Sequence, residues 1–283
     1  MPARSWLFVP GDSPEKIEKS SAMGADARII DLEDAIPAGR KAAAREQVAA
    51  WLSQRSDPGE IWIRVNNTPE LLDDDLRAVL VEDVAGVVLP KTQDGSQAHE
   101  VGEKLARIAA GVGFVPMVET ALAVLDAAKI ATASGVTTLM VGEYDLAAEL
   151  GVVLSDFHPE LQTARSMVVL ACSAAGVESP IGPVSTQFRD EALFLSTTKR
   201  LRAEGHFGRA VIHPAQIGPA NHVFTPTSVD VSRARDLVEA FELQKESGVG
   251  VSVDADGALV DEAIARLANR TLETAKHLEE ETQ

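Results

Sequence analysis

Short apolar segments alternate with longer amphipathic ones along most of this 283-residue chain. Runs rich in Val, Ile and Leu between amphipathic segments are typical of a parallel sheet whose strands are covered by helices on both faces. Eight such alternations predict an α/β fold, the (β/α)₈ TIM barrel. The expected strands are Trp6–Val9, Arg28–Asp31, Ile61–Asn66, Gly86–Leu89, Gly113–Glu119, the apolar start of Thr137–Asp145, Val177–Val184 and Arg209–His213.

An open, doubly wound sheet could carry the same alternation. However, no Gly-x-Gly-x-x-Gly motif follows the first expected strand, and the chain has no Gly-x-x-x-x-Gly-Lys-Ser/Thr motif, so a dinucleotide or nucleoside triphosphate site lacks its usual support. We therefore predict a barrel over residues 1–225. Residues 226–283 are expected to form a C-terminal helical extension. Its last helix, Asp261–Glu280, has an apolar stripe that needs a partner surface, either the barrel or a neighbouring subunit.

The charge and the cysteine content exclude several classes of protein. A net charge of −17 argues against nucleic acid or an anionic membrane as partner, because both would repel an acidic surface. The single cysteine, Cys172, permits no internal disulfide and is expected to be buried and inert. Neither a membrane-spanning run nor a signal peptide is recognisable, so we expect a cytoplasmic protein.

Two carboxylates mark the most specific candidate site. Glu119 ends the fifth expected strand, and Asp145 follows the sixth after a turn at Gly142. Because the carboxyl ends of barrel strands face a common pocket, the pair can share one cation. Zinc-type spacing is absent, so the oxygen ligands favour Mg²⁺ first and Mn²⁺ second. The alternative is that Glu119 and Asp145 only cap the helices that follow them.

Further polar residues gather at the ends of other expected strands. A cation with open positions could chelate a 2-oxo or 2-hydroxy acid, and Arg64 could stabilise negative charge that develops on an oxygen. The alternative for Arg64 is a purely structural ion pair with Asp31 or Glu33. His213 is expected to be a core histidine. The polar candidates at strand ends are Asp31, Glu33, Asp34, Arg64, Asn66, Lys91 and His213.

Taken together, these motifs resemble the citrate lyase beta subunit/malyl-CoA lyase family of the HpcH/HpaI aldolase superfamily, whose barrels are of the pyruvate/phosphoenolpyruvate type. The resemblance runs from residue 4 to about residue 261. The motifs that carry it are Arg4–Gly11, Asp31–Asp34 followed by Lys41 and Arg45, Arg64–Asn66, Pro90-Lys91, Glu119-Thr120, Gly142–Asp145, Gly208, Ile212–Gln216 and Phe224–Pro226.

The resemblance implies Mg²⁺ on Glu119 and Asp145, with Arg64 as a catalytic residue at the reacting oxygens of the substrate. It also implies a 2-oxo acid and a coenzyme A or acyl-carrier thioester as substrates, and a homotrimer or a multiple of it. In relatives that cleave thioesters, an Asp in the C-terminal tail reaches the neighbouring subunit's site as acid/base. Asp261 matches that position.

The remaining expected site residues surround this centre. Glu33 and Asp34 are predicted to assist catalysis by orienting water or Arg64. Arg4 and Lys91 are expected to bind substrate together with Arg64 and Glu119.

The predicted function is therefore a Mg²⁺-dependent carbon–carbon lyase. It would cleave or form a 3-hydroxyacyl thioester such as malyl-, citramalyl- or citryl-CoA, giving a 2-oxo acid and an acyl thioester. One alternative is a class II-type aldolase that uses a free aldehyde. Aldolases of that kind carry a His where this chain has Asp34, which favours the thioester branch. Another alternative is a non-catalytic metabolite-binding subunit.

Two segments depart from the family pattern. Pro180–Pro183 replaces the usual Ile-Asp-Gly of the seventh strand, and Gly257-Ala258-Leu259 lacks the usual basic residue before the tail Asp. The first change affects the acyl side of the pocket. The second removes a positive charge that could meet a coenzyme A phosphate.

Overall fold

The computed structural model of the chain describes residues 3–55, 59–81, 83–247, 252–253 and 259–280. The chain divides into two compact units, residues 2–222 and 223–283. In the first unit, seven parallel strands form one sheet in the order β6-β5-β4-β3-β2-β1-β7. These strands are β1 (Ser5–Pro10), β2 (Ala27–Asp31), β3 (Glu60–Arg64), β4 (Gly86–Leu89), β5 (Gly113–Val118), β6 (Met140–Val141) and β7 (Arg209–Val211). The expectation of an α/β fold with a parallel sheet is confirmed.

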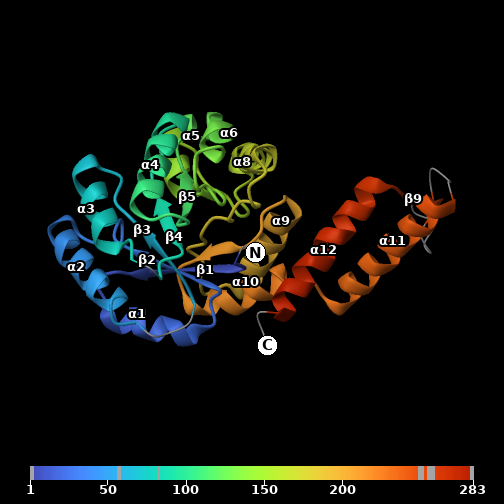
Figure 1. Cartoon of the computed structure of the whole chain (residues 1–283), viewed down its shortest axis with the longest axis horizontal. Coiled ribbons are helices and arrows are strands. Elements are labelled where there is room, and N and C mark those ends of the chain that lie inside the picture. The colour runs from blue at the N-terminus through green and yellow to red at the C-terminus, as the bar shows by residue number, and fades with distance from the viewer. Residues whose placement is uncertain (1–2, 56–58, 82, 248–251, 254–258, 281–283) are drawn as a thin grey trace. The chain divides into compact units, whose positions relative to one another are not determined.

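Helices follow the strands in regular alternation and surround them in the first unit (Figure 1). Local signals explain where several begin. Pro14 opens α1 at a position where no amide hydrogen is needed, and Asp94 caps α4 by accepting a hydrogen bond from the Gln97 amide at 2.9 Å. The helices are α1 (Pro14–Ser20), α2 (Lys41–Leu52), α3 (Pro69–Val79), α4 (Gly95–Ile108), α5 (Ala121–Leu125), α6 (Ala127–Ala131), α7 (Glu143–Leu150), α8 (Gln162–Ala175), α9 (Glu191–Ala203) and α10 (Ile217–Phe224).

The expected strand Val177–Val184 is not a regular strand. This segment makes two isolated parallel bridges instead, from Ile181 to Met140 and from Gly182 to Arg209. Pro180 and Pro183 explain the difference, because neither has an amide hydrogen to donate to a ladder. The segment therefore lies between β6 and β7 with the Glu178, Ile181 and Gly182 amides donating, to Thr137 O at 3.0 Å, Leu139 O at 2.9 Å and Gly208 O at 3.0 Å.

Side chains on the two faces of the sheet form separate cores. The larger core lies between the sheet and the helices and includes Ile30 and Ile63, whereas the smaller inner core contains Trp6, Trp62 and Val115. The Trp62 ring fills this inner core against Gly113, where an added Cβ would stand 2.6 Å from the ring. Since apolar side chains fill the inner face of the sheet, the polar residues are left to gather at the carboxyl ends of the strands.

The second unit is a pair of helices joined through a short antiparallel hairpin. Helix α11 (Ser228–Ser247) leads to β8 (Ser252–Val253) and β9 (Leu259–Val260), and α12 (Glu262–Glu280) follows. Helix α12 agrees with the expected Asp261–Glu280, and the two helices lie side by side (Figure 1). Ala265 and Ala268 of α12 are buried, but Leu267 of the predicted apolar stripe is 60% exposed. The departure at Gly257-Ala258 lies outside the described residues.

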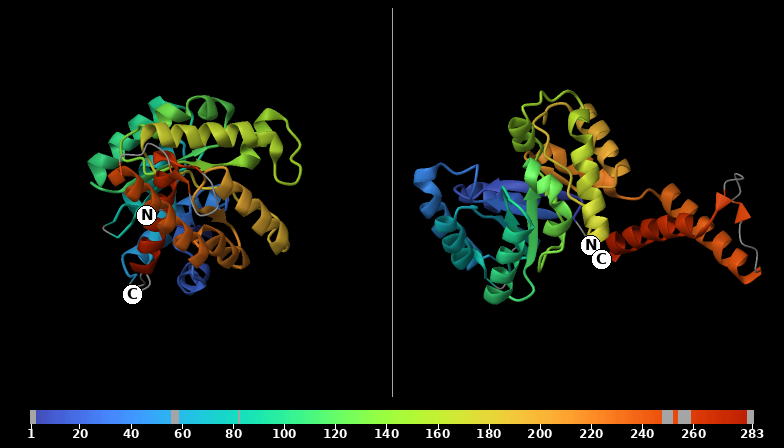
Figure 2. Two further views of the ribbon diagram at one scale, coloured as in Figure 1. Left: turned by 90° about the vertical axis from the view of Figure 1, so that its right-hand side faces the viewer. Right: turned by 90° about the horizontal axis from the view of Figure 1, so that it is seen from above.

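Cys172 is fully buried in α8, and burial raises the pKa of its thiol to about 11. The expectation of a buried, inert cysteine is therefore met. The two further views in Figure 2 show α8 as one long, uninterrupted helix. None of the helices that the structure describes is long and apolar enough to cross a bilayer.

Candidate active site

A cavity of about 420 Å³ opens at the carboxyl ends of the strands. Its polar lining comes from the last residues of β2 and β3 and from segments that follow β2, β5 and β6, so residues far apart in sequence meet at one end of the sheet. Its remaining wall is largely apolar. The lining residues are Phe8, Pro10, Asp31, Asp34, Ala35, Arg64, Met117, Glu119, Met140, Val141, Gly142, Glu143, Tyr144, Asp145, Val184, Ala210 and Ile212.

The two predicted metal ligands both line this cavity. Glu119 directly follows β5 and is 2% exposed, whereas Asp145 lies in the first turn of α7 and is exposed. The two segments approach closely because residue 142 is glycine: a Cβ there would stand 2.6 Å from the Cβ of Glu119. Thr120, not Glu119, caps α5, and no side chain caps α7. The helix-capping alternative is therefore wrong for both carboxylates.

The electrostatics at Glu119 suit a cation. Burial raises the pKa of Glu119 to about 7. The Lys91 amide, which donates to Glu119 Oε1, lowers this pKa, whereas the negative charge of Asp145 raises it further. A cation between the carboxylates would relieve both the burial penalty and the repulsion. Among the described residues, no group of three or more His, Cys, Asp and Glu side chains is arranged to hold a metal ion. The pair thus suits Mg²⁺, which commonly takes one or two carboxylates and fills its other positions with water or substrate oxygens.

Arg64 lies beside this pair at the end of β3. Its Nε and Nη2 donate to the two carboxylate oxygens of Asp31 at 2.7 and 2.6 Å, and Nη1 is 3.3 Å from Glu33. Its guanidinium also lies 4.7 Å from the centre of the Phe8 ring. The Asp31 ion pair considered as an alternative for Arg64 is thus present. The ion pair holds one edge of the planar Arg64 guanidinium against Asp31, and the Arg64 side chain still lines the cavity.

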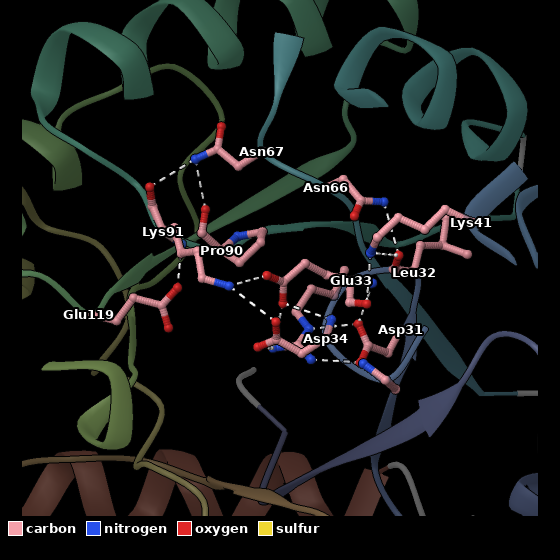
Figure 3. A network of polar contacts seen from close by, with 12 residues as sticks. Asp31, Leu32, Glu33, Asp34, Lys41, Asn66, Asn67, Pro90, Lys91 and Glu119 are labelled. Carbon is pink, nitrogen blue, oxygen red and sulfur yellow. Dashed lines mark hydrogen bonds and ion pairs between the residues drawn. The ribbon is translucent and has the colours of Figure 1, made fainter. Parts of the chain in front are cut away.

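Lys91 contacts both Glu119 and the acidic segment Glu33-Asp34, which follows β2. Figure 3 shows its Nζ between the carboxylates of Glu33 and Asp34; the distance to Asp34 is 3.1 Å. Burial alone would lower the pKa of Lys91, but its hydrogen bonds and ion pairs with these carboxylates raise it above its usual range. Burial raises the pKa of Glu33 in turn. Lys91 therefore stays charged and holds the acidic segment in place.

One residue that the sequence reasoning did not single out as a site residue, Asn67, holds this arrangement together with Lys91 and Asp31. Lys91 adopts a left-handed backbone (φ 50°), which is costly for a side chain with a Cβ. Asn67 stabilises the conformation, because its Nδ2 donates to Pro90 O at 2.8 Å and to Lys91 O at 2.9 Å. Asp31 accepts the Glu33 amide at 2.8 Å, which turns the chain after β2. The signal in the sequence is that Asn67 directly follows the Arg64-Val65-Asn66 motif.

The family motif residues Lys41 and Asn66 support the same segment from the side away from Lys91 (Figure 3). Lys41 Nζ donates to the carbonyls of Leu32 and Glu33 at 3.1 and 2.9 Å, and Asn66 Nδ2 donates to Leu32 O at 2.9 Å. Asn66 is itself held by the buried carboxylate of Asp75 at 2.7 Å. These residues position the acidic segment and do not line the cavity.

Three candidates lie elsewhere. Arg4 precedes β1 at the amino end of the sheet, where it pairs with Asp26 at 2.7 Å, so the structure does not bring it together with the other site residues. Asp261 belongs to the second unit and caps α12, accepting the Ile264 amide at 2.9 Å. The expectation of a core His213 is wrong: its side chain is exposed and stacks on Phe188 with ring centres 4.8 Å apart.

Known proteins resemble this chain over nearly its whole length. The (3S)-malyl-CoA thioesterase of Cereibacter sphaeroides is 34% identical over 280 residues, which cover 97% of this chain and 95% of that protein. The citrate lyase subunit beta of Leuconostoc mesenteroides is 29% identical over 96% of this chain and 93% of its own. A crystal structure of CitE from Mycobacterium tuberculosis, in complex with magnesium, acetoacetate and coenzyme A, matches with a TM-score of 0.78. It is 28% identical and covers 96% of this chain and 97% of that one.

Residues 4–214 match the HpcH/HpaI aldolase/citrate lyase family, and this match spans most of the first unit with its cavity. The chain therefore belongs to the HpcH/HpaI aldolase/citrate lyase family.

Proposed function

We propose that this chain is a Mg²⁺-dependent carbon–carbon lyase that cleaves or forms a 3-hydroxyacyl-CoA thioester of the malyl, citramalyl or citryl type. The observation that carries the proposal is the convergence of Glu119, Asp145 and Arg64 on one cavity. The family membership supports it, and so do the magnesium and coenzyme A bound to the related CitE.

Glu119 and Asp145 are the residues that would hold the metal. Bound Mg²⁺ would act as a Lewis acid toward a chelated 2-oxo acid and its developing enolate charge. Arg64 would hydrogen-bond the reacting oxygens with donors that Asp31 does not use, and its charge would stabilise the same oxygens. Glu33 and Asp34 would position Arg64, which both contact from the other side, and Lys91 would keep the two carboxylates in place.

Asp261 is proposed as the group that exchanges a proton with the enolate carbon. This role requires the C-terminal unit to meet a barrel, and the proposal includes a homotrimer, or a multiple of it, in which each tail completes a neighbour's site. Coverage of 97% of this chain by the malyl-CoA thioesterase alignment supports the inclusion of the tail. Arg4, which pairs with Asp26 at the other end of the sheet, is assigned to that structural ion pair here and has no part in the mechanism.

The proposal also covers the finer architecture. We infer a complete (β/α)₈ barrel of residues 1–225 in which the Pro180–Pro183 segment takes the place of one strand, followed by a helical extension of residues 226–283. The bridges from Ile181 to Met140 and from Gly182 to Arg209 support closure, and the division near residue 222 supports the boundary. A cytoplasmic location is the expectation for a chain with one buried cysteine.

A panel of thioesters tests the function. Malyl-, citramalyl- and citryl-CoA would each be incubated with the protein and Mg²⁺, and 2-oxo acid and free thiol would be measured separately. Release of a 2-oxo acid with no free thiol is the expected result, because a lyase leaves the acyl thioester intact. Free thiol without 2-oxo acid would instead indicate thioester hydrolysis, as the name of the Cereibacter relative describes.

The same assay addresses the two alternatives. A class II-type aldolase would act on a 2-oxo acid with a free aldehyde and would leave all three thioesters unchanged. A non-catalytic subunit would bind a 2-oxo acid in the presence of Mg²⁺ and turn over neither kind of substrate.

A further inference from the structure

A second cavity, of about 220 Å³, lies beside the candidate active site and shares Glu143 and Tyr144 with it. It is formed by the segment before α8, the segment after Pro183, helix α9 and the start of β7. Its lining includes Arg209 at the start of β7, Arg165 on α8, Arg200 and Glu204 on α9, and Ser185. None of the functional roles proposed above involves this space.

Arg209 is a buried cation in this cavity without a carboxylate partner. Its side chain belongs to a residue that is only 4% exposed, and no carboxylate oxygen of the described residues lies within 4.0 Å of its guanidinium. Its acceptors among the described residues are all neutral: Nε donates to Pro183 O at 3.0 Å, and Nη1 donates to Phe194 O at 3.2 Å, Thr197 Oγ1 at 2.9 Å and Thr198 Oγ1 at 2.6 Å. Burying an unpaired charge is costly, so the site favours an anion.

One edge of this guanidinium remains available. Nε and Nη1 account for all of the hydrogen bonds that Arg209 makes in the described structure, and Nη2 makes none. Nη2 is also not among the fully buried polar atoms that lack a partner, so it reaches open space. The Phe194 ring, 4.3 Å from the guanidinium, holds the group flat. Arg209 therefore presents a fixed, charged donor to the cavity.

The other charged groups of the cavity largely neutralise one another. Arg165 pairs with Glu143 and, at 2.7 Å, with Glu204, which also accepts Arg200 at 2.7 Å. These two arginines and two glutamates cancel, and Asp156 at the exposed rim is not within ion-pair distance of Arg209. Arg165 Nη2 also has no partner, but it is fully buried and does not reach the open space of the cavity. The unbalanced charge at the base of the cavity is thus positive.

We propose that this second cavity binds a small oxyanion, a phosphate or a carboxylate group, on the guanidinium of Arg209. A guanidinium and an oxyanion form charge-assisted hydrogen bonds of complementary geometry. The volume of about 220 Å³ suits an anion of a few heavy atoms and is below the range of sites for drug-sized ligands. The proposal does not depend on the lyase reaction.

Calorimetric titration of the full chain with inorganic phosphate, and separately with acetate, tests the proposal at constant ionic strength set with chloride. Saturable binding of at least one oxyanion is expected. Stronger binding of phosphate identifies a phosphoryl-type ligand, and stronger binding of acetate identifies a carboxylate. Arg209→Met should weaken binding by about 10- to 100-fold, the loss expected for a hydrogen bond to a charged group.

Arg107→Met is the matched control, because Arg107 is an exposed arginine of α4 outside the cavity. It should bind the anion as the wild type does. Since Arg209 also holds α9, a second variant, Ser185→Phe, fills the cavity and leaves Arg209 in place; it should bind no anion. The proposal is overturned if neither anion binds the wild type saturably, or if Ser185→Phe binds with wild-type affinity.

Discussion

At the scale of single residues, charge compensation decides which groups can act. Arg64 has 12% side-chain exposure and would be expensive to bury alone, but Asp31 and Glu33 stabilise its charge. Glu119 is the opposite case: its carboxylate is buried beside another carboxylate and has only the Lys91 amide as a donor. A bound cation would offset this burial and repulsion, and we therefore propose Glu119 as the centre of a metal site.

Removal of either metal ligand is expected to abolish Mg²⁺-dependent turnover and leave the fold intact. Glu119→Gln and Asp145→Asn each replace a carboxylate with a neutral amide, which binds Mg²⁺ poorly. The Lys91 amide can still donate to the Gln oxygen, so little stability should be lost. Turnover at saturating Mg²⁺ and the near-ultraviolet circular dichroism spectrum are the measurements.

Glu100→Gln, at an exposed position of α4, is the control for lost charge and should keep full activity. Near-wild-type rates in both ligand variants would refute the metal assignment.

His206 predicts an acid-sensitive component of stability. It is 3% exposed, and neither ring nitrogen has a partner. Burial, and then the charge of Arg165, lowers the pKa of His206 from 6.5 to about 4. Below pH 6.5 the unfolded chain therefore binds a proton that the folded chain does not, and stability falls between pH 6.5 and about 4.

Urea unfolding of the wild type and of His206→Leu at pH 7 and pH 5 measures this component. The wild type should lose about 2 kcal/mol more stability than the variant over that interval. Equal losses in the two proteins would show that His206 does not remain neutral in the fold.

At the scale of elements, the ends of helices and strands carry the site. Glu119 lies where β5 gives way to α5, Asp145 lies in the first turn of α7, and Arg64 is the last residue of β3. Each element is anchored by its own apolar face, so the polar end is positioned without having to contribute to the core. Asp261 directly precedes α12 and has a structural role of its own, because it caps that helix.

Asp261→Asn and Asp261→Ala separate this capping role from the proposed acid/base role. Asn caps helices about as well as Asp, whereas Ala costs about 1 kcal/mol. Neither substitute can exchange a proton, so both variants should lose roughly 10²- to 10⁴-fold in lyase turnover. Their affinity for a 2-oxo acid, measured by calorimetry with Mg²⁺, should stay unchanged.

Wild-type turnover in Asp261→Asn would mean that Asp261 only caps α12. Loss of 2-oxo acid binding would assign it to the ligand shell instead.

At the scale of the whole molecule, the chain consists of a sheet-and-helix unit with its own two cores and a helical pair that follows it. The catalytic proposal needs both units, because the metal carboxylates belong to the first and Asp261 to the second.

Truncation after residue 250 is therefore expected to break the oligomer and to abolish turnover. It removes α12, which packs along α11, and it removes Asp261. Light scattering coupled to size-exclusion chromatography gives the oligomeric state, and the thioester assay gives the activity. A truncated chain that is a fully active monomer would contradict the shared site.

Much of the fold and part of the site could be predicted from local pattern alone. The position of Glu119 after an apolar run and the turn at Gly142 before Asp145 both follow from short stretches of sequence. They can be predicted because burial imposes a repeating pattern of apolar residues along the chain, and that pattern changes where a strand ends and a helix begins. The helices after these strands, and the buried Cys172, were predicted on the same grounds.

Contacts between distant segments needed the tertiary structure. Sequence alone left open whether Asp31 or Glu33 pairs with Arg64, because the answer depends on the register of β2 and β3, in which Asp31 lies opposite Arg64. The irregular Pro180–Pro183 segment and the left-handed Lys91 depend likewise on hydrogen bonds to other parts of the chain. The unpaired Arg209 could only be found once every carboxylate around it had been located. Periodicity is a property of neighbours in sequence, but pairing is a property of neighbours in space.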